Sequence, residues 1–504
     1  MRFFKTAALL VFLAGASGAE NLKISVYHTN DIHGGIMSRP AAHDEEPKRK
    51  IGGAAAMASL IKQDKNPKLI LDAGDWFQGT PEGNLSRGQS LIDVFNAVGY
   101  DAVAVGNHDF DFGEARLKTL VKGLKMPALG ANIYRVKGGK RVDYLRPWII
   151  KEVAGIKIGI FGLLTAKMPS LAFPDNYTGL KFRRELDEAK DVVKALREQG
   201  AHVIIALTHV GFESQGLAPF EGDQTLAGEV KGIDLIVGGH THTPVKDPLR
   251  DANYGTLIVQ AGTALSSVGR VVLEIDRREK RVIWSSGELV DLWVKKVGED
   301  PEVLAVVQRH ERGVGRLYDA VIATAAVALR RSRDNESALG SWMTDCARQW
   351  AGTDIAVQNG GGIRADMDGG PLTPREIFNI MPFDNRVVKL TMKGRLIRDA
   401  INHGTGKGLQ MLQVSGISFF YNRDKAQTSS VFVGSKPLDD EASYTVATLD
   451  FLVEGGDGYS PFSRAEKKDF TGTLMRDVLR ECAEKQALIK PPASGRMRPG
   501  ARGG

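Results

Sequence analysis

Short apolar runs that end abruptly in polar residues recur along the first 290 residues. The run LKISVYHT (22–29) is followed by NDIHGG, and KLILDA (68–73) is followed by GDWFQG. Runs of this length that are rich in β-branched residues are typical of buried strands. Helix-like text such as GGAAAMASLIKQDK and DEAKDVVKALREQG separates several of them. This alternation predicts an α/β sheet with helices on its faces.

The polar residues that follow these runs are of the same few kinds. Histidine, aspartate or asparagine appears in DIHGG, in GD, in GNHDFDFG after DAVAV, in THVG after VIIAL, and in GGHTH after IDLIV. In open α/β sheets, ligands gather beyond the carboxyl ends of the strands. We therefore expect one site built from Asp31, His33, Asp75, Asn107, His209, His240 and His242.

This set of side chains has the chemistry of a transition-metal site. Imidazole and carboxylate together favour Zn, Mn, Fe or Co over a dedicated Ca or Mg site. Seven ligands are too many for one tetrahedral ion, but they fit two divalent ions, such as Zn, Mn or Co, that share a bridging carboxylate. Such a pair lowers the pKa of a bridging water, so hydroxide is available near neutral pH. The other histidines lack this context and are expected to be structural or surface residues: His28, His43, His202, His310 and His403.

From about residue 320 the sequence pattern predicts a second α/β domain, which contains several glycine clusters. Glycine lets backbone approach a ligand closely, arginine can hold phosphate bidentately, and two aromatic rings can hold a nucleobase. A single Phe in apolar text is nevertheless more often part of a core, and a glycine triplet more often a turn. The segments QNGGGIR, MPFDN and LDFLVEGGDGYS supply groups suited to a nucleotide: Asn359, Arg364, Phe383, Asn385, Phe451 and Asp457.

The N-terminal segment MRFFKTAALLVFLAGASGAE has the pattern of a secretory signal. Two basic residues precede a short apolar core, and Ser17 and Ala19 occupy the positions that a signal peptidase requires. We predict a signal peptide over 1–19, cleavage after Ala19, and a periplasmic or secreted mature chain. The apolar core is too short to span a membrane, and no later segment is long and apolar enough, so no membrane anchor is expected.

A chain of 504 residues is too long for one ordinary domain. The text DPEVLAVVQRHERGVGRLY reads as a helix that connects two domains, with Asp300 as its cap and Pro301 at its first position. The last residues are rich in Pro, Gly and Arg without periodicity, which predicts disorder. We predict a first domain, a linker helix, a second domain and a disordered tail over 20–298, 299–319, 320–490 and 491–504.

The formal net charge of +7 is spread along the chain. This favours a mildly basic surface over nucleic-acid binding, which needs a basic patch, although positive charge can help attract anionic substrates. We expect a monomer that does not bind a nucleic acid polymer. The two cysteines, Cys346 and Cys482, lie far apart in helix-like text. An oxidising compartment permits a disulfide, but the spacing does not decide between a disulfide and two buried thiols.

Taken in order, DIHGG, LDAGDWFQGT, GNHDFDFG, THVG and GGHTH resemble the calcineurin-like metallophosphatases, and more narrowly the secreted 5′-nucleotidase / UDP-sugar hydrolase family. The resemblance covers nearly the whole mature chain. It implies an N-terminal four-layer α/β/β/α metallophosphatase sandwich and a C-terminal α/β substrate-binding domain that rotates between open and closed states. By the family pattern, one metal is bound by Asp31, His33 and His242, and the other by Asn107, His209 and His240. Asp75 bridges the two metals. Some relatives have Gln in place of His242, which leaves the native metal open.

The resemblance also implies a catalytic pair and a set of substrate-binding residues. By the resemblance, His108 is expected to be the catalytic residue and to pair with Asp111. This role agrees with physical chemistry, since an imidazolium can stabilise the charge of a phosphoryl transition state. Asp109 is expected to be a turn residue whose side chain bonds local backbone. In the family pattern the base is stacked by Phe383 and Phe451 and contacted by Asn385, the ribose by Asp457, and the phosphates by Arg333 and Arg364. Arg330 and Arg331 lie out of register with a further family arginine and are not assigned.

We expect an exported phosphohydrolase that removes the 5′-phosphate from nucleotides such as AMP. UDP-sugars and nucleoside di- and triphosphates could be hydrolysed in the same site. Relatives with this metal core cleave 2′,3′-cyclic nucleotides and act as 3′-nucleotidases, or act as thiohydrolases in sulfur oxidation; the pair Phe383 and Phe451 favours nucleotides. A nucleotide-binding protein without activity would be indicated by a broken ligand set or a missing His108–Asp111 pair, and both are intact.

Overall fold

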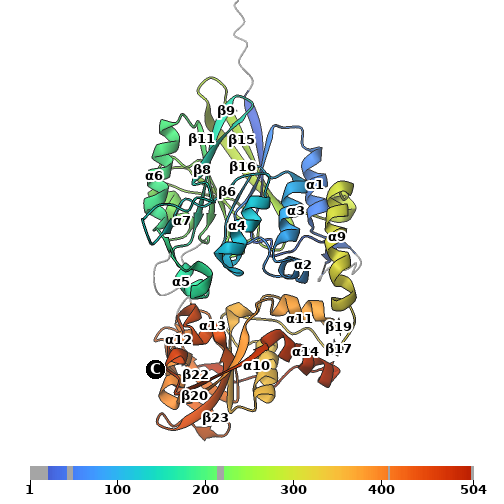
Figure 1. The fold of residues 1–504 in the computed structure, drawn as a ribbon, viewed down its shortest axis with the longest axis vertical. Coiled ribbons are helices and arrows are strands. Elements are labelled where there is room, and N and C mark those ends of the chain that lie inside the picture. The colour runs from blue at the N-terminus through green and yellow to red at the C-terminus, as the bar shows by residue number, and fades with distance from the viewer. Residues whose placement is uncertain (1–20, 42–48, 213–220, 407–408, 501–504) are drawn as a thin grey trace, which may run out of the picture.

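The computed structural model describes residues 21–41, 49–212, 221–406 and 409–500 of the chain. The predicted signal peptide and His43 lie outside these residues. In Figure 1 the chain forms two bodies, the first in blue through green to yellow and the second in orange to red. In the part of the chain that the structure describes, every helix is too short or too polar to traverse a bilayer.

The N-terminal domain contains two six-stranded sheets, and both end where the polar loops begin. In spatial order the first sheet consists of β16 (Arg281–Asp291), β15 (Ser267–Asp276), β1 (Leu22–Thr29), β4 (Lys68–Asp72), β5 (Ala102–Ala104) and β6 (Ala128–Leu129). The second consists of β13 (Leu249–Arg250), β14 (Leu257–Val259), β12 (Leu235–Gly238), β11 (Val203–His209), β9 (Ile156–Leu164) and β8 (Trp148–Val153).

Helices cover the outer faces of both sheets, which produces four layers (Figure 1). On the first sheet they are α1 (Ala54–Gln63), α3 (Gln89–Val98) and α4 (Gly113–Gly123), and on the second α6 (Glu185–Glu198) and α7 (Asp223–Glu229). The short α2 (Pro81–Leu85) lies at the boundary with the second domain (Figure 1). Strand side chains such as Ile24, Leu71, Ile158 and Ile205 fill the layer between the sheets. The expected α/β/β/α sandwich is therefore confirmed.

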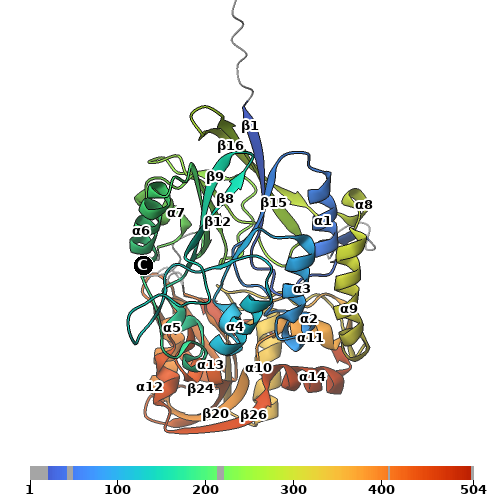
Figure 2. The ribbon, with the colours of Figure 1, turned by 45° about the horizontal axis from the view of Figure 1, so that its top comes forward.

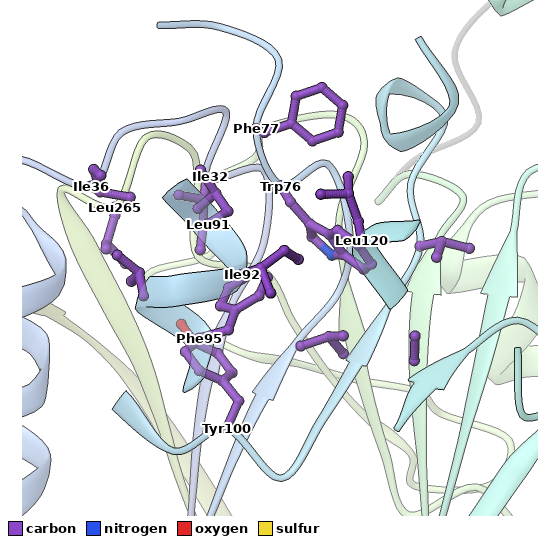
Figure 3. Packing of buried hydrophobic residues seen from close by; sticks show 14 of the residues in the cluster. Ile32, Ile36, Trp76, Phe77, Leu91, Ile92, Phe95, Tyr100, Leu120 and Leu265 are labelled. Carbon is purple, nitrogen blue, oxygen red and sulfur yellow. The ribbon is translucent and has the colours of Figure 1, made fainter. Parts of the chain in front are cut away.

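The core between the first sheet and its helices supports the loops at the sheet's edge. Figure 3 shows Trp76, Leu91, Phe95 and Tyr100 packed together beneath these loops. The indole Nε1 of Trp76 donates to the carbonyl oxygen of Ala104 at 2.8 Å. The residue directly after Asp75 is thus anchored in the core, which fixes the position of that loop.

The C-terminal domain is built on a mixed five-stranded sheet, as the second α/β block predicts. Its strands are β21 (Leu412–Ser415), β18 (Ile355–Asn359), β25 (Ser443–Leu449), β20 (Arg386–Lys393) and β26 (Lys467–Leu474). Smaller sheets contain β19 (Gly370–Leu372), β17 (Ala323–Ala325) and β27 (Leu488–Ile489), and β24 (Lys436–Pro437), β23 (Gln427–Val433), β22 (Ile417–Asn422) and β28 (Met497–Pro499). The helices are α10 (Ala338–Ala351), α11 (Pro374–Ile380), α12 (Gly394–Thr405), α13 (Asp450–Val453) and α14 (Met475–Gln486).

Helix α9 (Pro301–Tyr318) connects the domains and lies close to the predicted 299–319. The carboxylate of Asp300 accepts from the backbone N–H groups of Glu302 and Val303, so the predicted cap is confirmed. Val303 and Val307 are buried in the core of the N-terminal domain. The helix is therefore part of that domain, and the chain crosses to the second domain after it.

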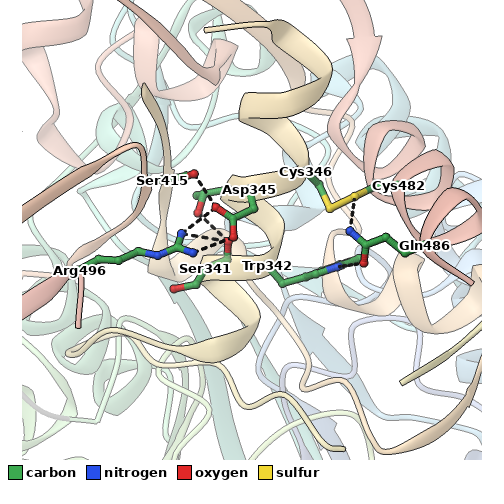
Figure 4. Close-up of a disulfide and its surroundings, with 9 residues drawn as sticks. Ser341, Trp342, Asp345, Cys346, Ser415, Cys482, Gln486 and Arg496 are labelled. Atoms are coloured by element: carbon green, nitrogen blue, oxygen red, sulfur yellow. Dashed lines mark hydrogen bonds and ion pairs between the residues drawn. A yellow bond between two sulfur atoms is a disulfide. The ribbon is translucent and has the colours of Figure 1, made fainter. Parts of the chain in front are cut away.

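A disulfide joins Cys346 of α10 to Cys482 of α14 (Figure 4). The alternative of two buried free thiols is thereby excluded. Beside the bridge, Nε1 of Trp342 donates to Oε1 of Gln486 at 3.1 Å. Two helices far apart in sequence are thus tied together in the core of the C-terminal domain.

The prediction of a disordered tail over 491–504 is wrong for residues 491–500. β28 pairs in parallel with β22, and Met497 is buried. Nη2 of Arg496 lies 2.7 Å from Oδ2 of Asp345 (Figure 4), and the carboxylate of Glu336 accepts from backbone N–H groups of the tail. Long-range partners order this segment, which its composition alone does not indicate.

Candidate metal centre and substrate cleft

All seven predicted metal ligands lie where the two sheets of the N-terminal domain end. β1, β4 and β5 are parallel in one sheet, and β11 and β12 are parallel in the other. Their carboxyl ends bring the side chains to one edge: Asp31 and His33 after β1, Asp75 after β4, Asn107 after β5, His209 at the end of β11, and His240 and His242 after β12.

Four of these residues converge on one point. The ligand atoms of Asp31, His33, Asp75 and His242 all lie within 4.8 Å of one another. Nε2 of His33 is 3.0 Å from Nε2 of His242, and that atom is 3.3 Å from Oδ1 of Asp31. Two imidazoles and two carboxylates around so small a space fit one metal ion.

The remaining ligands lie on the other side of Asp75. Oδ2 of Asp75 is 3.1 Å from Nε2 of His209 and 3.6 Å from Nε2 of His33, so this carboxylate lies between the two groups. Nδ1 of His240 is 2.9 Å from Oδ1 of Asn107. Nε2 of His209 is buried and faces carboxylate oxygens of Asp75 and Asp31, at 3.1 Å and 3.9 Å, as a metal-ligating nitrogen would. The residues present fit a pair of divalent ions.

Backbone carbonyls orient two of the imidazoles. Nδ1 of His33 lies 2.6 Å from the carbonyl oxygen of Gln78, and Nδ1 of His209 lies 2.8 Å from that of Ala73. An N–H at Nδ1 that donates to a carbonyl leaves Nε2 unprotonated and directed inward. This is the usual outer-shell support of a metal-bound imidazole.

The backbone is strained at five of the seven predicted ligands. The φ angles are 48° at Asp31, 50° at His33, 60° at Asp75, 78° at His240 and 57° at His242. Residues other than glycine rarely adopt such angles, and they keep them only where the surroundings enforce them, at a cost of about 1–3 kcal/mol each. No pattern in the sequence predicts this strain.

Asp109 fixes the loops that carry Asp75 and Asn107. Its buried carboxylate accepts from the backbone N–H of Gly106 at 2.7 Å, of Asp75 at 3.1 Å and of Trp76 at 2.9 Å. The expected bond to local backbone is confirmed, and the other two bonds join a second loop to it. A Cβ at Gly106 would lie 2.1 Å from Oδ1 of Asp75, so space requires glycine there.

His108 and Asp111 form the expected pair beside this cluster. Nδ1 of His108 is 2.8 Å from Oδ2 of Asp111, and the backbone N–H of His108 donates to Oδ1 of Asp75 at 2.9 Å. Burial is the largest influence and lowers the pKa of His108, but the charges of Asp111 and Asp75 outweigh it, so the pKa lies above its ordinary value. The pair favours an imidazolium.

One cleft of about 320 Å³ joins this cluster to the C-terminal domain. From the N-terminal domain it is lined by Asp75, Asn107, His108, Asp111, His240 and His242, among others. All seven predicted substrate-binding residues line it from the other side: Arg333, Asn359, Arg364, Phe383, Asn385, Phe451 and Asp457. The structure thus brings both predicted sets to the same space.

Arg364 reaches across this cleft to the metal-ligand cluster. Its Nη2 is 3.2 Å from Nε2 of both His33 and His242. Burial, followed by the charge of Arg333, lowers the pKa of Arg364 to about 10, so the guanidinium stays charged at neutral pH. The ring centroid of Phe383 lies 5.6 Å from Cζ of Arg364. The same ring stacks on His108, with 5.2 Å between the ring centroids. A cation there can hold an anionic group against the metal site.

The turn that carries Asp457 is held by two neighbours. Nδ2 of Asn359 donates to Oδ2 of Asp457 at 2.7 Å. Asp457 has a φ of 52°, and Nε2 of His403 lies 2.9 Å from its carbonyl oxygen. His403 therefore has a structural role next to the cleft. Nδ2 of Asn385 lies 3.2 Å from Oδ1 of Asp450, which orients that amide.

The sequence pattern did not identify every residue that lines the cleft. The segment after β9 contributes Lys167, Phe173 and Asn176. Because β9 is parallel to β11, the strand-end rule applied to IKIGIFGLL would have found this segment. Gln78 and Gln410 also line the cleft, and no comparable signal marks them.

Comparison with known proteins extends this picture over nearly the whole chain. Residues 24–244 match the family model described as calcineurin-like phosphoesterase, and residues 318–464 match that of the 5′-nucleotidase C-terminal domain. The snake venom 5′-nucleotidase of Crotalus adamanteus is 30% identical, over 95% of this chain and 89% of its own length. Protein UshA of Yersinia enterocolitica is 29% identical, over 96% of each chain.

Solved structures share the arrangement of both domains. The 5′-nucleotidase precursor from Thermus thermophilus superposes with a TM-score of 0.87 at 28% identity, over 95% of this chain and 99% of that chain. The sulfate thiohydrolase SoxB of the same genus has a TM-score of 0.80 but 17% identity, so it shares the fold alone. Fold and site define a metal-dependent phosphoric ester hydrolase. The chain belongs to the 5′-nucleotidase family.

Proposed function

We propose that this protein removes the 5′-phosphate from nucleoside 5′-monophosphates such as AMP, with UDP-sugars or nucleoside di- and triphosphates as further substrates. One observation carries the proposal. Arg364 lies 3.2 Å from His33 and His242 in the same cleft that Phe383 and Phe451 line. A phosphate and an aromatic base can therefore be bound at once.

The proposed reaction would use two divalent ions, and one residue would be a ligand to both. When bound, divalent ions such as Zn, Mn or Co would neutralise phosphate charge and supply hydroxide near neutral pH. One ion would be held by Asp31, His33 and His242. The other would be held by Asn107, His209 and His240, and Asp75 would bind both.

Side chains of both domains position the phosphate. Arg333 and Arg364 bind its oxygens and hold it against the metal centre. Because Nδ1 of His108 donates to Asp111, the imidazolium presents its Nε2–H to a phosphoryl oxygen, where negative charge builds up in the transition state. His108 is thus proposed as the catalytic residue, and Asp111 as the residue that orients and charges it.

The nucleoside is bound by the C-terminal domain. Phe383 and Phe451 hold the base, Asn385 contacts its edge, and the carboxylate of Asp457, fixed by Asn359, accepts from ribose hydroxyls. The two domains contact each other beside the cleft, where Nδ2 of Asn84 donates to the carbonyl oxygen of Pro382 at 2.9 Å. We propose rotation about the chain segment after α9. A crosslink that holds the domains apart should abolish turnover, and full activity in the locked protein would contradict the rotation.

A substrate panel with purified protein tests the function. AMP, UDP-glucose, ATP, 2′,3′-cyclic AMP and a thiosulfonate are compared by product release, with and without chelator. We expect the highest kcat/KM with AMP and complete loss with chelator. A higher kcat/KM for the cyclic nucleotide or the thiosulfonate would replace the proposed function by one of these alternatives. Export is tested by N-terminal sequencing of the mature protein, which should begin at Glu20.

A further inference from the structure

A segment of the N-terminal domain, residues 167–176, projects onto the nucleoside end of the cleft. It contains the short helix α5 (Met168–Leu171) and the start of the 3-10 turn η2 (Pro174–Tyr177). α5 lies against η4 (Gly456–Gly458), the turn that contains Asp457. Figures 1 and 2 both place α5 beside α13, the helix that carries Phe451.

Phe173 is the residue of this segment that meets an aromatic ring of the other domain. Its ring centroid lies 6.0 Å from that of Phe451, at an interplanar angle of 82°. Both rings line the same cleft. The arrangement is an edge-to-face pair, a favoured aromatic geometry, and it exists only where the two domains meet.

The N-terminal domain, which carries the predicted metal ligands, holds this segment firmly. Met168, the first residue of α5, and Ala172, directly after it, are buried in the core of that domain. The backbone N–H of Asn176 donates to the carbonyl oxygen of Phe173 at 2.9 Å, and Oε1 of Glu185 accepts from the backbone N–H of Ala166 at 2.6 Å. Phe173 is therefore presented to the C-terminal domain from a fixed position relative to the metal ligands.

We propose that Phe173 is a specificity-determining residue that completes the nucleobase pocket from the metal-bearing domain. It packs against Phe451 and borders the space in which the base lies, but only in the closed arrangement. The inference rests on the proposed nucleotide function and deepens it. A base in the pocket then stabilises closure over the metal centre, whereas a phosphoester without a base gains nothing from Phe173.

The test compares AMP with ribose 5-phosphate, which has the same sugar and phosphate but no base. Phe173→Ala should raise KM for AMP about 2- to 12-fold, the span of one aromatic pair, and leave ribose 5-phosphate kinetics within about twofold. Phe173→Leu, which preserves bulk but not the ring, should show the same selective loss, and Phe173→Tyr should retain wild-type values. The matched control is Phe470→Ala on the exposed face of β26, which should change neither substrate.

The possible outcomes distinguish a role of Phe173 in base recognition from a general role in closure. An equal loss with both substrates would overturn the proposal, since Phe173 would then be a general closure contact. Unchanged AMP kinetics in a folded Phe173→Leu variant, with an active wild type, would also overturn it and leave the proposed function intact. A wild type that does not hydrolyse AMP would instead overturn the proposed function, and this inference with it. Metal content and melting temperature measured beside the kinetics show whether each variant is folded and loaded.

Discussion

The two domains hold their halves of the site in different ways. In the N-terminal domain the predicted ligands follow the ends of strands. Their direction is set by strained backbone and by hydrogen bonds to carbonyl oxygens, such as that from His209 to Ala73. In the C-terminal domain Arg364 and Phe383 come from loops and find partners in the other domain, namely His33 and His108. The metal half is therefore built within one domain, whereas the recognition half takes shape only where the domains meet.

Removing Asp75 should break the metal half most completely. Its carboxylate lies between both ligand groups, so Asp75→Ala should lose bound metal and lower AMP hydrolysis by at least about 10³-fold. Metal content by elemental analysis and phosphate release measure the two effects. Wild type treated with chelator is the control and should regain activity when Zn, Mn or Co is added. A variant that keeps two ions and full turnover would refute the assignment of Asp75.

His108→Ala separates chemistry from metal binding within the same domain. We expect both ions to remain and kcat to fall about 10²- to 10⁴-fold, because the positioned imidazolium is lost. Asp111→Asn keeps the imidazole but removes its charged partner, so its kcat should fall less. If His108→Ala were purified without metal, His108 would have to be reassigned as a ligand.

Phe383→Ala tests the recognition half. Loss of a stacking ring should raise KM for AMP about 5- to 150-fold and leave metal content unchanged. Ribose 5-phosphate, which has no base to stack, should be affected far less, and Phe470→Ala again serves as the control. Unchanged affinity for AMP would remove base stacking from the proposal.

Asp109→Asn tests whether bonds to backbone preform the metal half. An amide cannot accept from all three N–H groups that the carboxylate now binds, so metal affinity should fall about tenfold or more although no ligand is changed. Titration with Zn after removal of the native metal gives the affinity. Wild-type affinity in the variant would show that the loops hold their shape without Asp109.

The double variant Cys346→Ser, Cys482→Ser should affect activity least. The disulfide lies away from the cleft, so kcat and KM at 25 °C should stay within about twofold of wild type. The free energy of unfolding should fall by about 2–4 kcal/mol, measured by urea denaturation. A large loss of AMP hydrolysis in the folded variant would show that the bridge shapes the recognition half after all.

Much of the metal half could be predicted from sequence because local patterns carry it. A buried strand marks itself by its apolar run, and the carboxyl ends of parallel strands share one edge, so side chains such as Asp31 and His209 could be grouped without coordinates. The same rule would have indicated the segment of Phe173 after β9. The strain at the ligands escaped prediction, since it results from the close approach of loops that are far apart in sequence.

The sequence by itself determined the alternation of strands and helices, the cap of α9 and the kinds of ligand at the strand ends, because each depends on neighbours within a few residues. Only the tertiary structure decided that Cys346 pairs with Cys482, that Arg496 orders the tail through Asp345, and that Phe173 meets Phe451. These contacts join residues more than a hundred positions apart. Their free energy depends on how whole layers pack, and no local periodicity records it.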